Sequence, residues 1–150
     1  MDLILWRHAD AQDGEADMSR ELTAKGRKQA QQMATWLRAR LPETTRILVS
    51  PAVRALQTAD ALELDYQVVA NLAPGAVGEQ VLSAAGWPDA SGTVLLVGHQ
   101  PTLGDAASLL MFGETRGLSI KKGGLLWLTN RVRGSQPQTV LKAAMTPELA

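Results

Sequence analysis

The sequence predicts an α/β fold, a three-layer αβα sandwich with a mostly parallel central sheet and a C-terminal antiparallel hairpin. Short apolar runs of the kind buried on both faces of a parallel sheet occur at residues 3–6, 46–49 and 93–97. Segments with the apolar periodicity of a helix separate these runs. Two apolar segments around a Gly- and Pro-containing turn then close the chain, as strands of a hairpin do. Strands that alternate with helices favour a parallel sheet covered on both faces.

The first strand is expected over residues 3–6, and an acidic loop follows it. Thr23 has the character of an N-cap, so the next helix is predicted over residues 24–41, where Pro42 closes the segment. Its apolar positions share one face: Ala30, Met33, Ala34, Leu37 and Leu41.

The middle of the chain begins with a predicted strand over residues 46–49. Ser50 and Pro51 follow directly and indicate an N-cap and a first helical residue, with the helix extending to about Leu64. The side chains expected to face inward are Val53, Leu56, Ala59 and Leu62. A third strand over 66–69 and a short helix over 77–85 complete this part.

The next strongly buried strand is predicted over residues 93–97. A helix is expected from Pro101 to Met111, with Gly113 ending it. Segments 125–132 and 138–144 then predict the antiparallel hairpin.

Composition limits the classes of protein that this chain can represent. A length of 150 residues predicts a single domain over residues 1–150. Fifteen basic and fifteen acidic residues cancel, which argues against bulk binding of nucleic acid or of a membrane surface. The absence of cysteine excludes disulfides, thiolate metal sites and a cysteine nucleophile. No apolar run reaches the ~20 residues that a membrane span needs, and the early first strand argues against a signal peptide. We therefore expect a cytoplasmic protein.

Four cationic or titratable side chains follow predicted strands. Arg7 and His8 come after the first strand, Arg54 lies in the first turn of the helix after the second, and His99 follows the strand at 93–97. The chain has only these two histidines. Carboxyl ends of parallel strands form the ligand crevice of open α/β sheets. We therefore expect all four side chains at one edge of the sheet.

The chemistry of these residues points to a phosphoryl group. Guanidinium forks match phosphate oxygens and stay charged at any working pH. Arg54 opposes the dipole of its helix, which costs up to ~1 kcal/mol unless an anion is bound there. An imidazole can also serve as a nucleophile and form a covalent intermediate. No Gly-x-Ser-x-Gly elbow and no Gly-x-x-x-x-Gly-Lys loop offers another phosphate or acyl site.

Four stretches resemble the ordered motifs of the histidine phosphatase superfamily, and most closely those of its small SixA-type phosphohistidine phosphatases. The similarity covers about residues 1–112. The stretches are Leu-Ile-Leu-Trp-Arg-His-Ala at 3–9, Leu-Thr-Ala-Lys-Gly at 22–26, Val-Ser-Pro-Ala-Val-Arg-Ala-Leu-Gln-Thr at 49–58 and Val-Gly-His-Gln-Pro at 97–101.

The resemblance implies a role for each matched residue. His8 would be the nucleophile that becomes phosphorylated, while Arg7, Arg54 and His99 would hold the phosphoryl group. Arg20 would lie near the rim of the pocket. No metal and no organic cofactor is expected. The partner would be a histidine-phosphorylated protein in signal transduction, with phosphate or another oxyanion in the pocket.

The chain departs from the superfamily pattern in two ways. Ala9 stands where Gly is commonest, although alanine also occurs there in the SixA-like branch. No acidic residue is clearly placed as a proton donor, and Asp10, Asp17 and Glu79 are candidates by position only. An alkoxide leaving group needs a general acid, whereas the imidazole released from phosphohistidine needs far less help. The second departure therefore favours a phosphoramidate substrate over a sugar phosphate.

The leading hypothesis is a metal-independent phosphohistidine protein phosphatase that acts through phospho-His8. One alternative is a small-molecule phosphomonoesterase, and another is a non-catalytic module that binds phosphohistidine for regulation. A divalent-metal hydrolase with His8, His99 and an aspartate as ligands is a third alternative, which two arginines aimed at the same place disfavour.

Overall fold

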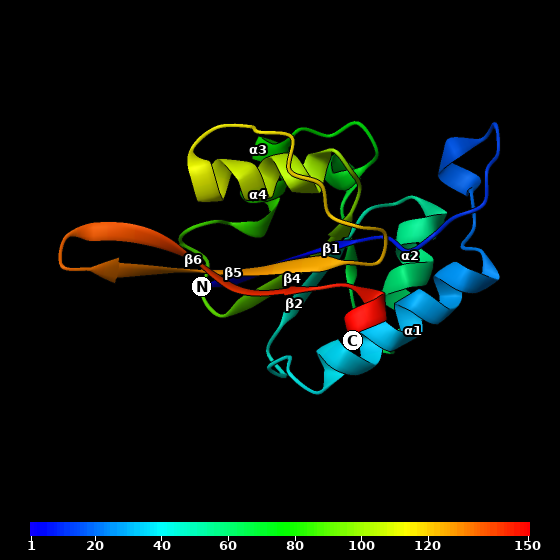
Figure 1. Ribbon diagram of the computed structural model, residues 1–150, viewed down its shortest axis with the longest axis horizontal. Helices are drawn as coiled ribbons and strands as arrows, with labels where there is room; N and C mark the ends of the chain where they lie inside the picture. Colours follow the sequence, from blue (N-terminus) through cyan, green and yellow to red (C-terminus); the bar gives the residue numbers. More distant parts are fainter.

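The computed structural model describes residues 1–150 and places a six-stranded mixed sheet between two layers of helices (Figure 1). The strand order is β3-β2-β4-β1-β5-β6. The first four strands in this order are parallel to one another. Strand β5 pairs antiparallel with β1, and β6 pairs antiparallel with β5. The mostly parallel sheet and the C-terminal hairpin predicted from the sequence are therefore confirmed. The strands are β1 (Asp2–Arg7), β2 (Arg46–Val49), β3 (Gln67–Val68), β4 (Thr93–Gly98), β5 (Leu125–Arg133) and β6 (Gln136–Met145).

One layer of helices packs on each face of the sheet, so the core has two halves (Figure 1). Ile4 and Trp6 of β1 belong to the half under α1 and α2, and Leu3 and Leu5 to the half under α3 and α4. Burial on both faces explains why β1 is uniformly apolar. None of the helices combines the length and apolar character that crossing a membrane requires. The helices are α1 (Ala24–Arg38), α2 (Val53–Asp60), α3 (Gly78–Ala85) and α4 (Thr102–Phe112), with short 3-10 turns η1 (Asp17–Ser19), η2 (Ala70–Leu72) and η3 (Pro147–Leu149).

The register holds the carboxyl ends of three parallel strands level. Val97 of β4 lies between Trp6 of β1 and Val49 of β2. The chain segments that carry His8 and His99 therefore leave the sheet at the same edge, as the sequence predicted.

Two predicted helix boundaries differ from the structure. Thr23 is confirmed as the N-cap of α1, since its side chain accepts a hydrogen bond from the backbone N–H of Gly26. This helix ends at Arg38 and not at residue 41, because a residue before proline, here Leu41, is disfavoured in helical geometry. The second helix ends at Asp60 and not at Leu64, and a left-handed residue follows at Glu63.

The start of α2 was also predicted incorrectly. The helix begins at Val53 with Ala52 as its N-cap, so Ser50 does not cap it. Its inward face was predicted correctly at Ala59 and Leu62, which are buried, but not at Val53, which is only half-buried. Arg54 and small residues such as Ala55 are the buried ones, whereas Leu56 is only half-buried. Small side chains bring the helix close to the sheet, and this orientation turns Arg54 toward the carboxyl ends of the strands.

Gly26 in the first turn of α1 lies against the loop that follows His8. A Cβ atom at this position would be 1.9 Å from the backbone oxygen of Asp10. We expect Gly26→Ala to destabilise the protein by ~1–3 kcal/mol through overpacking, although alanine forms helices better than glycine by about 1 kcal/mol. Urea denaturation measures the difference. Gly14→Ala is the control, since its Cβ would meet the Arg20 side chain at an ordinary 3.5 Å. A Gly26→Ala variant as stable as the wild type would contradict the close approach.

Candidate active site

The structure places the four predicted side chains around one cavity of about 200 Å³ at the carboxyl edge of the sheet. Arg7 and His8 reach it from the end of β1, Arg54 from the first turn of α2, and His99 from the segment after β4. Arg20, expected near the rim, also lines the cavity. Its remaining wall is formed by Ala11, Asp13, Pro74, Gln100 and Lys122.

His8 presents its Nε2 atom as a base. Nδ1 lies 2.8 Å from the backbone oxygen of Ala9, and since a carbonyl only accepts, the ring proton is on Nδ1. The unprotonated Nε2 then accepts a hydrogen bond from Nε of Arg54 at 3.3 Å. Burial, aided by the charges of Arg54 and Arg7, lowers the pKa of His8 to about 4. The imidazole is therefore neutral at pH 7 and able to act as a nucleophile.

Arg54 is buried and is held by the η1 turn. Its two terminal nitrogens donate to Asp17, one to the backbone oxygen at 2.8 Å and one to Oδ2 at 3.2 Å. Arg20 donates to the other oxygen of this carboxylate at 3.1 Å and to the backbone of Gln12 at 3.1 Å. Burial by itself raises the pKa of Asp17, but the hydrogen bond and charge of Arg54 outweigh it and lower the pKa. Asp17 is thus an ionised partner that orients two arginines beside His8.

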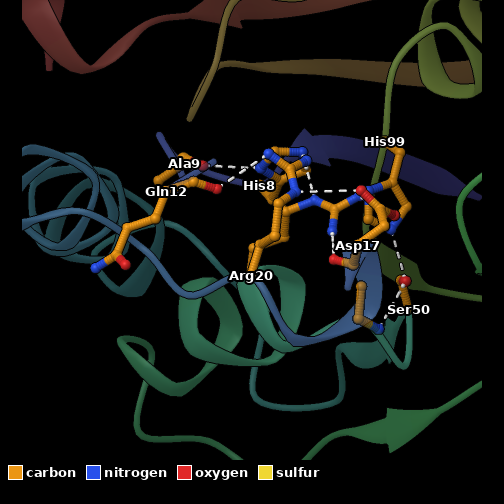
Figure 2. Close-up of polar contacts among 9 residues, drawn as sticks. His8, Ala9, Gln12, Asp17, Arg20, Ser50 and His99 are labelled. Carbon is orange, nitrogen blue, oxygen red and sulfur yellow. Dashed lines mark hydrogen bonds and ion pairs between the residues drawn. The ribbon is translucent and has the colours of Figure 1, made fainter. Parts of the chain in front are cut away.

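His99 is held by Ser50, a contact that sequence reasoning missed (Figure 2). Ser50 Oγ lies 2.7 Å from Nε2 of His99 and accepts a hydrogen bond from the backbone N–H of Ala52 at 3.2 Å. The ring centroid of His99 is 5.2 Å from that of His8. Burial, together with the charges of His8 and Arg54, lowers the pKa of His99 to about 3. The only signal for this role of Ser50 was its place directly after a buried strand.

Two buried nitrogen atoms of the cavity have no hydrogen-bond partner within the protein. Arg7 donates through Nη1 to the backbone oxygen of Ile120 at 2.7 Å, but its Nε forms no hydrogen bond, and neither does Nδ1 of His99. Buried polar groups are almost always hydrogen-bonded. An oxyanion with several acceptor oxygens fits such a set of cationic and neutral donors.

The carboxylates proposed as proton donors are placed differently from one another. Asp10 accepts from Thr23 Oγ1 at 2.7 Å and pairs with Lys122 at 2.9 Å, whose hydrogen bond lowers the pKa of Asp10. Glu79 is exposed at the start of α3. Neither of them lines the cavity, whereas Asp13 does, and no sequence signal distinguished Asp13 within its acidic loop. Nowhere do three or more His, Cys, Asp or Glu side chains come together in a way that could hold a metal ion.

Comparisons with known proteins agree on one family. The family model of the histidine phosphatase superfamily (branch 1) matches residues 3–77. An uncharacterized protein of Picosynechococcus sp. is 38% identical over 93% of this chain and 91% of its own length. Phosphohistidine phosphatase SixA of Escherichia coli (strain K12) is 36% identical over 77% of each chain. The solved structure of protein histidine phosphatase SixA complexed with tungstate matches with a TM-score of 0.82 and 27% identity over 98% of this chain and 97% of that chain.

The two buried histidines predict that stability falls on acidification. In the folded protein His8 and His99 have pKa values of about 4 and about 3, below the ordinary value of 6.5. Between the folded pKa and pH 6.5, each histidine therefore binds more protons in the unfolded chain than in the folded one. In that range the free energy of unfolding rises with pH by up to about 1.4 kcal/mol per pH unit for each histidine. The contribution of the two histidines is fully present above about pH 6.5 and is lost progressively as the pH falls below it.

Urea unfolding of the wild type and of His8→Gln at about pH 7 and about pH 5 measures this dependence. His8→Gln is expected to lose roughly half of the slope, since one of the two groups is gone. The same slope in both proteins would show that His8 is not held neutral.

Proposed function

This chain belongs to the histidine phosphatase superfamily, in its SixA-type branch, and from that premise we propose that it removes phosphoryl groups from protein histidines through phospho-His8. Membership of this branch makes the chain a phosphatase. The single observation that carries the finer proposal is the unprotonated Nε2 of the buried His8, which lies beside Arg54 and shares its cavity with His99 and Arg7. An intact nucleophile also disfavours a module that only binds phosphohistidine.

The reaction proceeds in two displacements. His8 Nε2 attacks the phosphorus of phosphohistidine, the P–N bond of the substrate breaks, and the departing imidazole takes its electron pair and a proton from water, which leaves hydroxide. A second water molecule then attacks phospho-His8 and gives its proton to that hydroxide. The P–N bond to His8 breaks, inorganic phosphate is released, and the electron pair returns to Nε2 of the free histidine. Nε of Arg7 and Nδ1 of His99, the two buried donors without a protein partner, donate to the phosphoryl oxygens, and Arg54 neutralises their charge.

The carboxylates near the site support a phosphoramidate substrate. Asp10 and Asp17 are engaged in ion pairs with cations, which favours their charged forms, and a carboxylate that stays charged is a poor general acid. Glu79 does not line the cavity. The alternative, a small-molecule phosphomonoesterase, rests on Asp13, the carboxylate that does line it. Tungstate in the similar SixA structure is consistent with an oxyanion in the pocket.

The proposal predicts that wild type releases phosphate from a histidine-phosphorylated protein in EDTA and that His8→Ala loses this activity by at least about a thousandfold. Radiolabelled substrate should transfer its label to the wild type, and the label should map to His8. Asp13→Asn should retain activity on phosphohistidine, because the imidazole leaves without a strong acid.

Three outcomes would contradict parts of the proposal. Cleavage of a sugar phosphate, abolished in Asp13→Asn, together with no release from phosphohistidine would favour the phosphomonoesterase. Capture of the phosphorylated protein without phosphate release would favour the binding module. Loss of activity in EDTA that added divalent metal restores would favour the metal hydrolase.

Ser50 is expected to be a positioning residue for His99. Because Ser50 Oγ accepts from Ala52 N–H, its own proton is available for Nε2 of His99, which keeps the His99 proton on Nδ1. Ser50→Ala should lower kcat by roughly tenfold to a hundredfold with little change in KM. Ser50→Thr keeps the hydroxyl and should recover part of the loss. Ser108→Ala removes an equally buried hydroxyl in α4 and should leave kcat unchanged, so an equal loss in both alanine variants would indicate a general structural effect.

A further inference from the structure

The active-site cavity opens into a longer groove. It shares Arg7 and Lys122 with a neighbouring hollow of about 410 Å³. That hollow shares Lys25, Gln29 and Lys121 with a third, of about 450 Å³. The second and third hollows together form what we call the basic groove. It runs from the cavity across one face of α1 to η3, which packs beside this helix (Figure 1).

The basic groove is strongly cationic in a chain without net charge. Five cationic and two acidic side chains line it, a surplus of three positive charges, whereas the whole sequence has 15 of each sign. No hydrophobic side chain lines either hollow. The cations are Arg7, Lys25, Lys28, Lys121 and Lys122. A groove of this composition attracts anionic groups and does not suit an apolar segment.

Two of these lysines have no counter-ion in the protein. Lys122 pairs with Asp10, and Lys121 with Glu148. Lys25 and Lys28 are exposed near the start of α1 and form no ion pair. The first turn of this helix contains no acidic residue. The carboxylate at its start is that of Asp10, which accepts a hydrogen bond from the N-cap Thr23 and is paired with Lys122. The ammonium groups of Lys25 and Lys28 are therefore open to an anionic group from another molecule.

We propose that the basic groove binds acidic side chains of the histidine-phosphorylated protein, on one side of its phosphohistidine. The inference rests on the proposed function, because it takes the phosphohistidine itself to lie beside His8. The groove begins at the wall of that cavity through Arg7 and Lys122. The groove therefore offers Lys25 and Lys28 to residues that neighbour a phosphohistidine bound in the cavity. Opposite charges there raise the association rate and select the partner.

Two synthetic phosphohistidine peptides of equal length test the proposal, one with glutamates on both sides of the histidine and one with serines. The wild type should have a kcat/KM at least about tenfold higher for the acidic peptide at low salt, and sodium chloride should reduce the preference. Lys25→Glu with Lys28→Glu should abolish the preference. Arg46→Glu with Arg133→Glu is the matched control, since both arginines are exposed at the opposite end of the sheet, and it should keep the preference.

A binding measurement tests recognition by the basic groove independently of the hydrolysis reaction. Fluorescence anisotropy of both peptides with His8→Ala should show the same preference and its loss in the lysine variant, even if no peptide is hydrolysed. If the wild type hydrolysed both peptides equally well, the proposed role of the basic groove would be wrong, whereas the proposed phosphatase function would still hold. Equally tight binding of a single-stranded oligonucleotide of the same charge would also overturn it, in favour of a general polyanion surface.

Discussion

The parallel pairing of β4 with both β1 and β2 holds three strand ends level, and the positions of Arg7, His8, Arg54 and His99 follow from it. Parallel strands need crossover helices, which cover both faces and leave only the sheet edge open to a ligand. The antiparallel β5 then closes the other side of β1. The cavity therefore lies where the chain leaves β1, β2 and β4, three neighbouring strands of the buried part of the sheet. Their pairing keeps the side chains at these strand ends in place before a ligand binds.

Burial of a guanidinium and two imidazoles at the end of this sheet would be unfavourable if their charges were left without partners. A buried guanidinium must be paired, and Asp17 pairs with Arg54 through a carboxylate that is itself half-exposed. The two histidines avoid the cost of a buried charge by staying neutral, as their low pKa values show. Neutral imidazoles among arginines provide the nucleophile and the hydrogen-bond donor of the mechanism that we propose. The ion pairs that hold Arg54 and Arg20 also engage the carboxylate of Asp17, so the contacts that orient these arginines disfavour Asp17 as a general acid.

Chemistry and recognition are divided between adjacent parts of one surface. The small cavity has room for a phosphoryl group, and the basic groove beside it is open and lined by long cationic side chains. An open groove of this kind suits a folded protein or a loop better than an enclosed metabolite.

The sequence alone determined the order of the elements and the α/β class, and it predicted that Arg7, His8, Arg54 and His99 meet at one edge of the sheet, because hydrophobic periodicity and position after a strand are local properties. Contacts between distant segments decided the rest. The phase of α2 depends on how closely its small residues approach the sheet, and Ser50 acquired its partner only when β2 and β4 paired. Asp17 and Asp13 belong to one loop without periodicity, and only folding turned one toward Arg54 and the other toward the cavity. The basic groove joins Lys25 to Lys121 across nearly a hundred residues, a distance over which no sequence pattern acts.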